Sequence, residues 1–134
     1  IELLLAVSIV GILAITAVPV FRGLLSENDL AIGRMMLSQA ARRAEANARA
    51  AMDDSDWGMY AASGRTVVFK GNAFSSRDEA QDATFALPSS IKFSETTVIF
   101  SRFTALPSQS VSLSLKAVNG NIAVWTLDMQ GVIN

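Results

Sequence analysis

The 134-residue sequence contains no cysteine and no histidine, and these absences exclude several functions. Without cysteine the chain has no disulfide, no thiolate metal site and no cysteine nucleophile. Without histidine it lacks the usual general base and the commonest metal ligand. Charge is also scarce: eleven basic and twelve acidic residues leave a net charge of −1, which gives no general attraction to nucleic acid. The length suits a single compact domain.

What the sequence does have is an apolar N-terminus. No ionisable residue occurs in the nineteen positions from Leu3 to Phe21, LLLAVSIVGILAITAVPVF. As a helix this run would rise roughly 28 Å, close to the roughly 30 Å hydrocarbon thickness of a bilayer. It is apolar on every face, as expected for a helix surrounded by lipid or by other apolar helices. We therefore predict a membrane-inserted helical segment whose uncharged run stops at Arg22; a buried core helix is the alternative.

Glu2 stands at the head of this apolar run and has two interpretations. In the first, its carboxylate favours the positive end of the helix dipole, which is worth roughly 0.3–1 kcal/mol. In the second, it is carried into an apolar assembly, where an unpaired charge costs about 3 kcal/mol or more and requires a cation. An α-amino terminus would be the cation available in every copy. The residues alone leave both interpretations open.

The segment IELLLAVSIVGILAITAVPVF resembles the N-terminus of type IV pilins and of the related pseudopilins of type II secretion. Ile1, Glu2 and Leu3 match the end of the family's Phe-Thr-Leu-Ile-Glu-Leu start. Gly11 matches its mid-helix glycine, and Pro19 matches the proline near the end of the helix. The resemblance covers roughly the first 25 residues.

The resemblance implies a precursor held in the inner membrane by a single pass, in contact with lipid, and cut by a prepilin peptidase. Pilus assembly machinery would then move it into a homo-oligomeric helical filament, either an extracellular pilus or a periplasmic pseudopilus. Glu2, Leu3, Gly11, Pro19 and Phe21 would serve subunit assembly, with Glu2 paired to the N-terminal amine of an adjacent subunit. Glycine and proline are weak helix formers, so we predict a kink or unwound stretch between Gly11 and Pro19 after assembly.

Residues 26–52 predict an amphipathic continuation of the helix. The polar residues 26–29 mark a point where the helix bends or briefly stops. Small and apolar residues then recur at spacings of four and three, which predicts a close approach to a sheet: Leu37, Ala41, Ala44, Ala48 and Ala51. Arg42 and Arg43 lie mostly off this stripe. They are interpreted either as a solvated helix face or as a charged contact at a head interface between subunits.

Residues 53–134 predict a β-rich head. Asp53, Asp54 and Asp56 are expected in a polar loop rather than a calcium site, because no further oxygen ligands follow at the required spacing. Strands are expected at 57–61, 65–70, 84–87, 91–93, 97–103, 111–118 and 122–127. The predicted fold is α+β: a long N-terminal helix, apolar over 1–25 and amphipathic over 26–52, packed on an antiparallel sheet as in pilins. The head also resembles the GspH/FimT-like branch, through Trp57-Gly58, Leu87-Pro88 and the Gly131-Val132-Ile133 ending.

The last hairpin carries the strongest turn signal, Asn119-Gly120. A two-residue turn there places Leu115 opposite Val124 on an inward face. Trp125 then falls on the solvent face, where it is either covered by a loop or part of a head interface.

The sequence shows no catalytic set, no cofactor motif and no metal site, since it lacks histidine, cysteine and a glycine-rich phosphate loop. This argues against an enzyme, and the resemblance to pilins implies a structural filament subunit. A minor pseudopilin of type II secretion and a minor pilin for DNA uptake are the alternatives. Six basic against eight acidic residues in 53–134 argue against nucleic acid as a partner, the candidate local patch being Arg65, Lys70 and Arg77.

Overall fold

The computed structural model describes the backbone of residues 1–134 and, apart from 16–20 and 22, their side chains. The predicted α+β class with antiparallel sheets is confirmed. The elements are α1 (Glu2–Arg49), η1 (Met52–Asp54), β1 (Trp57–Ala62), β2 (Arg65–Lys70), η2 (Phe74–Ser76), η3 (Glu79–Gln81), β3 (Ala83–Ala86), β4 (Ile91–Lys92), β5 (Thr96–Phe100), β6 (Val111–Ala117) and β7 (Ile122–Leu127).

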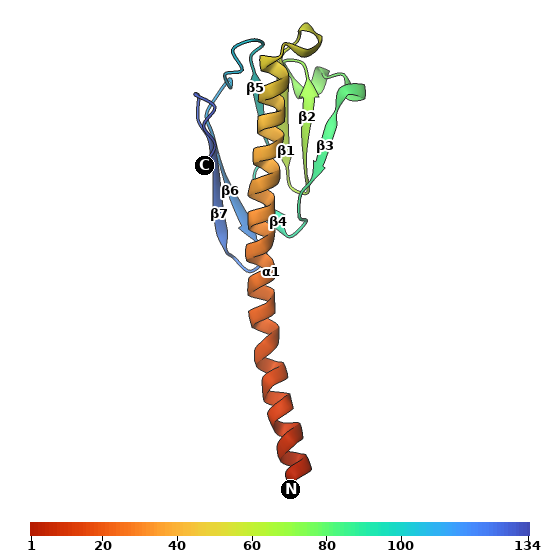
Figure 1. The fold of residues 1–134 in the computed structure, drawn as a ribbon, viewed down its shortest axis with the longest axis vertical. Coiled ribbons are helices and arrows are strands. Elements are labelled where there is room, and N and C mark those ends of the chain that lie inside the picture. Colours follow the sequence, from red (N-terminus) through yellow and green to blue (C-terminus); the bar gives the residue numbers. More distant parts are fainter.

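The strands form two antiparallel sheets instead of the single sheet predicted (Figure 1). One sheet has the order β3-β2-β1-β5 and the other β4-β6-β7. β4 precedes β5 in the chain but belongs to the second sheet, and an irregular segment separates β5 from β6. There Phe103 and Ala105 have positive φ angles of 68° and 54°, so the backbone leaves the extended conformation soon after Phe100. Strand pairing therefore restarts in a second sheet.

The second half of α1 lies against both sheets, whereas its first half projects beyond them (Figure 1). The predicted stripe is buried at four positions, Leu37, Ala41, Ala44 and Ala48. Leu30 and Ala40 are buried on this face as well. Ala51 lies past the end of the helix, at a left-handed φ of 49°. The approach is closest at Gly33, where an added Cβ would lie 2.7 Å from Ile91 Cδ1 of β4.

The helix does not stop at residues 26–29, so that alternative is wrong. Asp29 instead accepts a hydrogen bond from the Ser90 hydroxyl at 2.6 Å, and Leu30, the next residue, is buried. The polar patch therefore attaches α1 to the loop before β4. The kink predicted between Gly11 and Pro19 concerns the assembled state and stays a prediction. The side chain of Pro19 lies outside the described residues.

The β6–β7 hairpin differs by one residue from the predicted register. The Ala117 N–H donates to the Asn121 carbonyl at 2.9 Å, and the Gly120 N–H donates to the Ala117 carbonyl at 3.0 Å. The loop is therefore the three residues 118–120, with Gly120 at a φ of +90°. Such loops commonly end in a positive-φ residue. Because side chains alternate along a strand, this single-residue slip reverses the face on which every β7 side chain lies.

The prediction that Trp125 lies on the solvent face is consequently wrong. Trp125 pairs with Leu113 and is 1% exposed. Its Nε1 donates to the Ser38 hydroxyl of α1 at 3.0 Å. The ring is part of the core, so it does not supply a surface contact between heads. Ile122 and Val124 are exposed on the outer face instead.

Replacing Ser38 with alanine should lower the free energy of unfolding by about 1–3 kcal/mol, because the buried Trp125 N–H loses its acceptor. Denaturant unfolding followed by tryptophan fluorescence measures this, since Trp57 and Trp125 are both buried in the head. Ser112→Ala is the control, because Ser112 lies exposed on β6. Equal stabilities for the two variants would contradict the assigned hydrogen bond.

Candidate assembly site

The N-terminal half of α1 exposes a nearly uniform apolar surface. Leu3 is 80% exposed, and the other large apolar side chains at residues 4–10 are at least half exposed. Ser8 is the one polar residue among 3–15. Its hydroxyl donates a hydrogen bond to the Leu4 carbonyl at 2.7 Å, so the donor is paired within the helix. Phe21, Leu24 and Leu25 extend the surface toward the head. Contiguous exposed apolar surface of this extent marks an interaction site.

The predicted assembly residues are distributed along this surface. Glu2 lies in the first turn of α1, where its charge interacts favourably with the helix dipole. It forms no ion pair with any residue that the structure describes. Gly11 has open space around it, with nothing within 4 Å of an added Cβ. Leu3 and Phe21 are exposed, whereas the side chain of Pro19 is outside the described residues.

The predicted single-pass membrane anchor is corrected by the structure. Within residues 1–15, 21 and 23–134, no helix is long and apolar enough to cross a membrane. The helical stretch described in full before the gap, residues 2–15, rises only about 21 Å, against the roughly 30 Å of a hydrocarbon core. The predicted inner-membrane location, and the pilus or pseudopilus location derived from it, are therefore not retained.

Arg42 and Arg43 both lie exposed on α1, but they face different surroundings. The Arg43 guanidinium lies 5.9 Å from the centre of the Phe85 ring of β3. Arg42 lines a hollow of about 390 Å³ between α1 and the C-terminal segment, together with Trp125 and Asn134. Their part in a head interface stays a prediction.

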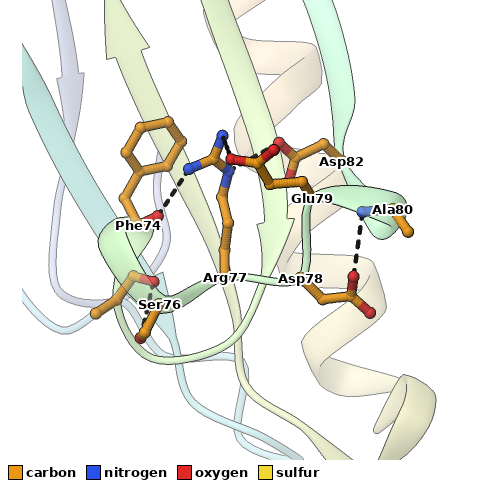
Figure 2. Close-up of polar contacts among 8 residues, drawn as sticks. Phe74, Ser76, Arg77, Asp78, Glu79, Ala80 and Asp82 are labelled. Carbon is orange, nitrogen blue, oxygen red and sulfur yellow. Dashed lines mark hydrogen bonds and ion pairs between the residues drawn. The ribbon is translucent and has the colours of Figure 1, made fainter.

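The loop of residues 71–82 is organised by Arg77, as Figure 2 shows. The Arg77 Nε donates to Asp82 Oδ2 at 2.8 Å, and its Nη1 donates to the Phe74 carbonyl at 2.9 Å. Its Nη2 lies 3.1 Å from Glu79 Oε1. The guanidinium also lies 3.9 Å from the centre of the Phe74 ring, which stacks on Tyr60 of β1 at 4.0 Å. The hydrogen bond with Asp82 raises the pKa of Arg77 above its ordinary value.

The candidate nucleic-acid patch of Arg65, Lys70 and Arg77 does not form. Arg65 and Lys70 lie at opposite ends of β2, and Lys70 Nζ is 3.6 Å from Asp53 Oδ2. Arg77 is engaged by two carboxylates. Two of the three cations are thus paired within the head, and the third, Arg65, lies at the opposite end of β2 from Lys70.

The acidic loop after α1 joins distant segments. The Arg102 N–H donates to Asp56 Oδ1 at 2.7 Å, and its guanidinium donates to the Asp54 carbonyl at 2.9 Å and to the Asp54 carboxylate. The Phe103 N–H donates to the Ala48 carbonyl at 3.0 Å, which satisfies one carbonyl at the end of the helix. Across the part of the chain with described side chains, no cluster of three metal-ligating residues occurs.

Two features of the surface are absent from the sequence-based predictions. Ser89 and Lys92 have the Ser-x-x-Lys spacing of some serine nucleophiles, but both are exposed and neither lines the hollows described here. Ile122 and Val124 form an exposed apolar strip on β7. If Asn119-Gly120 is taken as part of a three-residue loop, the sequence places Ile122 and Val124 on the outer face.

Comparison of the chain with protein-family models, with curated proteins and with solved structures found no match.

Tyr60 of β1, the one tyrosine of the chain, provides a pH test of the first sheet. A hydrogen bond to the Glu95 carboxylate raises the pKa of the Tyr60 hydroxyl above its ordinary value of 10.0, and desolvation adds to the shift. Because the pKa is raised in the folded state, the protonated hydroxyl stabilises the fold below pH 10, and this contribution is lost as the pH rises through the folded pKa.

Replacing Glu95 with glutamine should therefore lower the midpoint of the tyrosinate absorbance titration toward 10. Glu27→Gln, which removes a carboxylate from α1, is the control and should leave the midpoint unchanged. A midpoint that is the same in the Glu95 variant and in the unaltered chain would show that this carboxylate does not govern Tyr60.

Proposed function

We propose that the chain is a structural subunit of a pilus-like filament, polymerised through the exposed apolar half of α1. The observation that carries the proposal is the division of this helix into two parts. Every buried apolar side chain described lies at Leu30 or later, so the head has a complete core without the N-terminal half. The apolar side chains of residues 1–15 are exposed and lie outside the described core.

The energetics favour self-association of this surface. Burying one Leu, Ile or Val side chain contributes about 1.5–3 kcal/mol, so half a dozen would contribute on the order of 10 kcal/mol. Loss of translational and rotational freedom on association costs roughly 4–15 kcal/mol. Contacts with two or more neighbours, as in a helical filament, would therefore stabilise the polymer. The resemblance of Ile1-Glu2-Leu3, Gly11 and Pro19 to the pilin N-terminus supports the same function.

A DNA-uptake function finds less support. Its candidate patch is dispersed, and the head has more acidic than basic residues. Neutralisation of several phosphates requires clustered free cations. We therefore propose a filament subunit, and we place the chain among structural proteins and not among enzymes.

Removing residues 1–25 should leave a soluble monomeric head with an intact core, because Leu30 is the first buried core residue. Analytical ultracentrifugation measures the oligomeric state, and tryptophan fluorescence verifies the fold. The full chain should sediment as large assemblies under the same conditions. If the truncated chain still polymerises, the assembly surface lies on the head and the proposal is wrong.

Replacing Glu2 with alanine should raise the protein concentration required for assembly at least tenfold, if this carboxylate pairs with a cation of a neighbouring copy inside an apolar contact. Sedimentation of polymer across a concentration series measures this. Glu27→Ala removes the same charge from an exposed position of α1 near the head and should have little effect. If the Glu2 variant assembles as the unaltered chain does, the Glu2 carboxylate interacts only with the helix dipole.

A further inference from the structure

The segment between β5 and β6 displays an aromatic side chain at a strained backbone position. Phe103 has a φ of 68°, in the left-handed region that a bulky residue rarely adopts, and it is 63% exposed. Its N–H donates to the Ala48 carbonyl at the end of α1. A glycine would donate the same hydrogen bond without the strain. Neither the backbone nor the core therefore explains a phenyl ring at this position.

The ring lies at the end of the head where α1 stops, and other apolar side chains are exposed at the same end. The Arg102 guanidinium lies 5.0 Å from the centre of the Phe103 ring and donates to the Asp54 carbonyl of η1. Met52 of η1 and Leu106 are each nearly half exposed. A strained backbone that presents apolar side chains to solvent is typical of an interaction site.

The opposite end of the head has an apolar hollow. Its volume is about 490 Å³, and it is lined by Leu25 and Ser26 of α1 and by Val118 and Asn119 of the β6–β7 loop. Val118 is 82% exposed and Leu25 is 61% exposed, so both apolar side chains face solvent in a single copy. Ile122, the first residue of β7, is also exposed. A hollow of this volume is large enough for an aromatic side chain.

The distance between the two ends matches the length of the exposed half of α1. Figure 1 shows the β5–β6 segment at the upper end of the head and the β6–β7 loop at the lower end. The helix rises about 35 Å from Leu25 to Ala48, and about 35 Å from Glu2 to Leu25. If two copies stack end to end with parallel helices, the exposed half of the upper copy therefore runs alongside the whole head of the lower copy.

We propose that the heads of successive copies stack end to end, with Phe103 of one copy inserted between Leu25 and Val118 of the next. The partner is a second copy of this chain, because one end of the head offers a projecting ring and the other a hollow. Parallel stacking brings the two together and leaves the N-terminal halves of the helices to pack with one another. This inference rests on the proposed filament function and names the contact that sets its axial spacing.

The stacking contact is small, so it depends on the helices. The exposed apolar side chains at each end of the head offer on the order of 300 Å², against the roughly 800 Å² that each partner buries in a stable interface. Stacking alone would not hold two heads together, which agrees with a monomeric head after removal of residues 1–25. Because the two contacting surfaces differ, the contact can be repeated from copy to copy.

Disulfide cross-linking tests the contact directly, because the chain has no cysteine of its own. Thr104 is exposed beside Phe103, and Asn119 lines the hollow. A full-length chain with Thr104→Cys and Asn119→Cys should give a ladder of covalent multimers under mild oxidation, since the two positions lie at opposite ends of one head. A chain with Thr104→Cys and Ser75→Cys is the control, because Ser75 is exposed in the loop that bears Arg77. Equal ladders from both chains, or none from the first, would overturn the inference.

Substitutions test the ring and the hollow separately. Phe103→Asn removes the ring and introduces a residue that tolerates a positive φ. It should raise the protein concentration required for assembly at least tenfold without lowering the stability of the head in denaturant. Val118→Asp places a charge in the hollow and should impair assembly to a similar extent. Val124→Asp, the same change on the outer face of β7, is the control and should have little effect.

The outcomes separate the stacking contact from the proposed function. If Phe103→Asn and Val118→Asp assemble as the unaltered chain does, while removal of residues 1–25 abolishes assembly, the stacking contact is wrong and the filament function stands. If the unaltered full-length chain forms no polymer at any concentration, the filament function is wrong, and the stacking contact with it.

Discussion

The close packing of the second half of α1 against two sheets is the constraint on which the rest of the structure depends. Glycine and alanine occupy the helix face at the contact, and at Gly33 even one added methyl group would meet Ile91. Such small residues let the backbone of the helix approach the strands, so the sheets on its two sides share one core. Because this core begins at Leu30, the preceding turns of the same helix lie outside it, and the apolar side chains described at residues 1–15 are exposed.

The continuity of α1 gives its exposed N-terminal part a defined direction. The helix runs through residues 26–29 without interruption, and Asp29 attaches it to the loop before β4. The exposed apolar half is therefore held in a fixed direction relative to the head. In the proposed filament, contacts between different surfaces of successive copies would extend into an open polymer when the rotation between copies does not close a ring.

The head contains no disulfide, and polar contacts hold its loops in place. Arg77 holds the loop before β3 through one carbonyl and two carboxylates, and Arg102 joins the end of α1 to the segment between the sheets. The C-terminal residue Asn134 exchanges two backbone hydrogen bonds with Thr126, at 2.8 and 3.0 Å, along the edge of β7. These contacts engage most of the cations of the first sheet and of the loops, whereas Lys92 and Lys116 on the second sheet remain unpaired among the described residues.

The sequence by itself determined the helical stripe from Leu37 to Ala48, the apolar character of the N-terminal residues and the position of both hairpins, because these depend on local periodicity and turn residues. It did not determine the register of β7. Asn119-Gly120 is compatible with both a two-residue and a three-residue loop, and the choice depends on which β7 side chains, Trp125 among them, pack into the core. Only the tertiary structure decided which β7 side chains are buried, how the strands divide between two sheets, and which cations find partners. The physical reason is that alternation along a strand fixes two faces, and only packing against the helix selects the inner one.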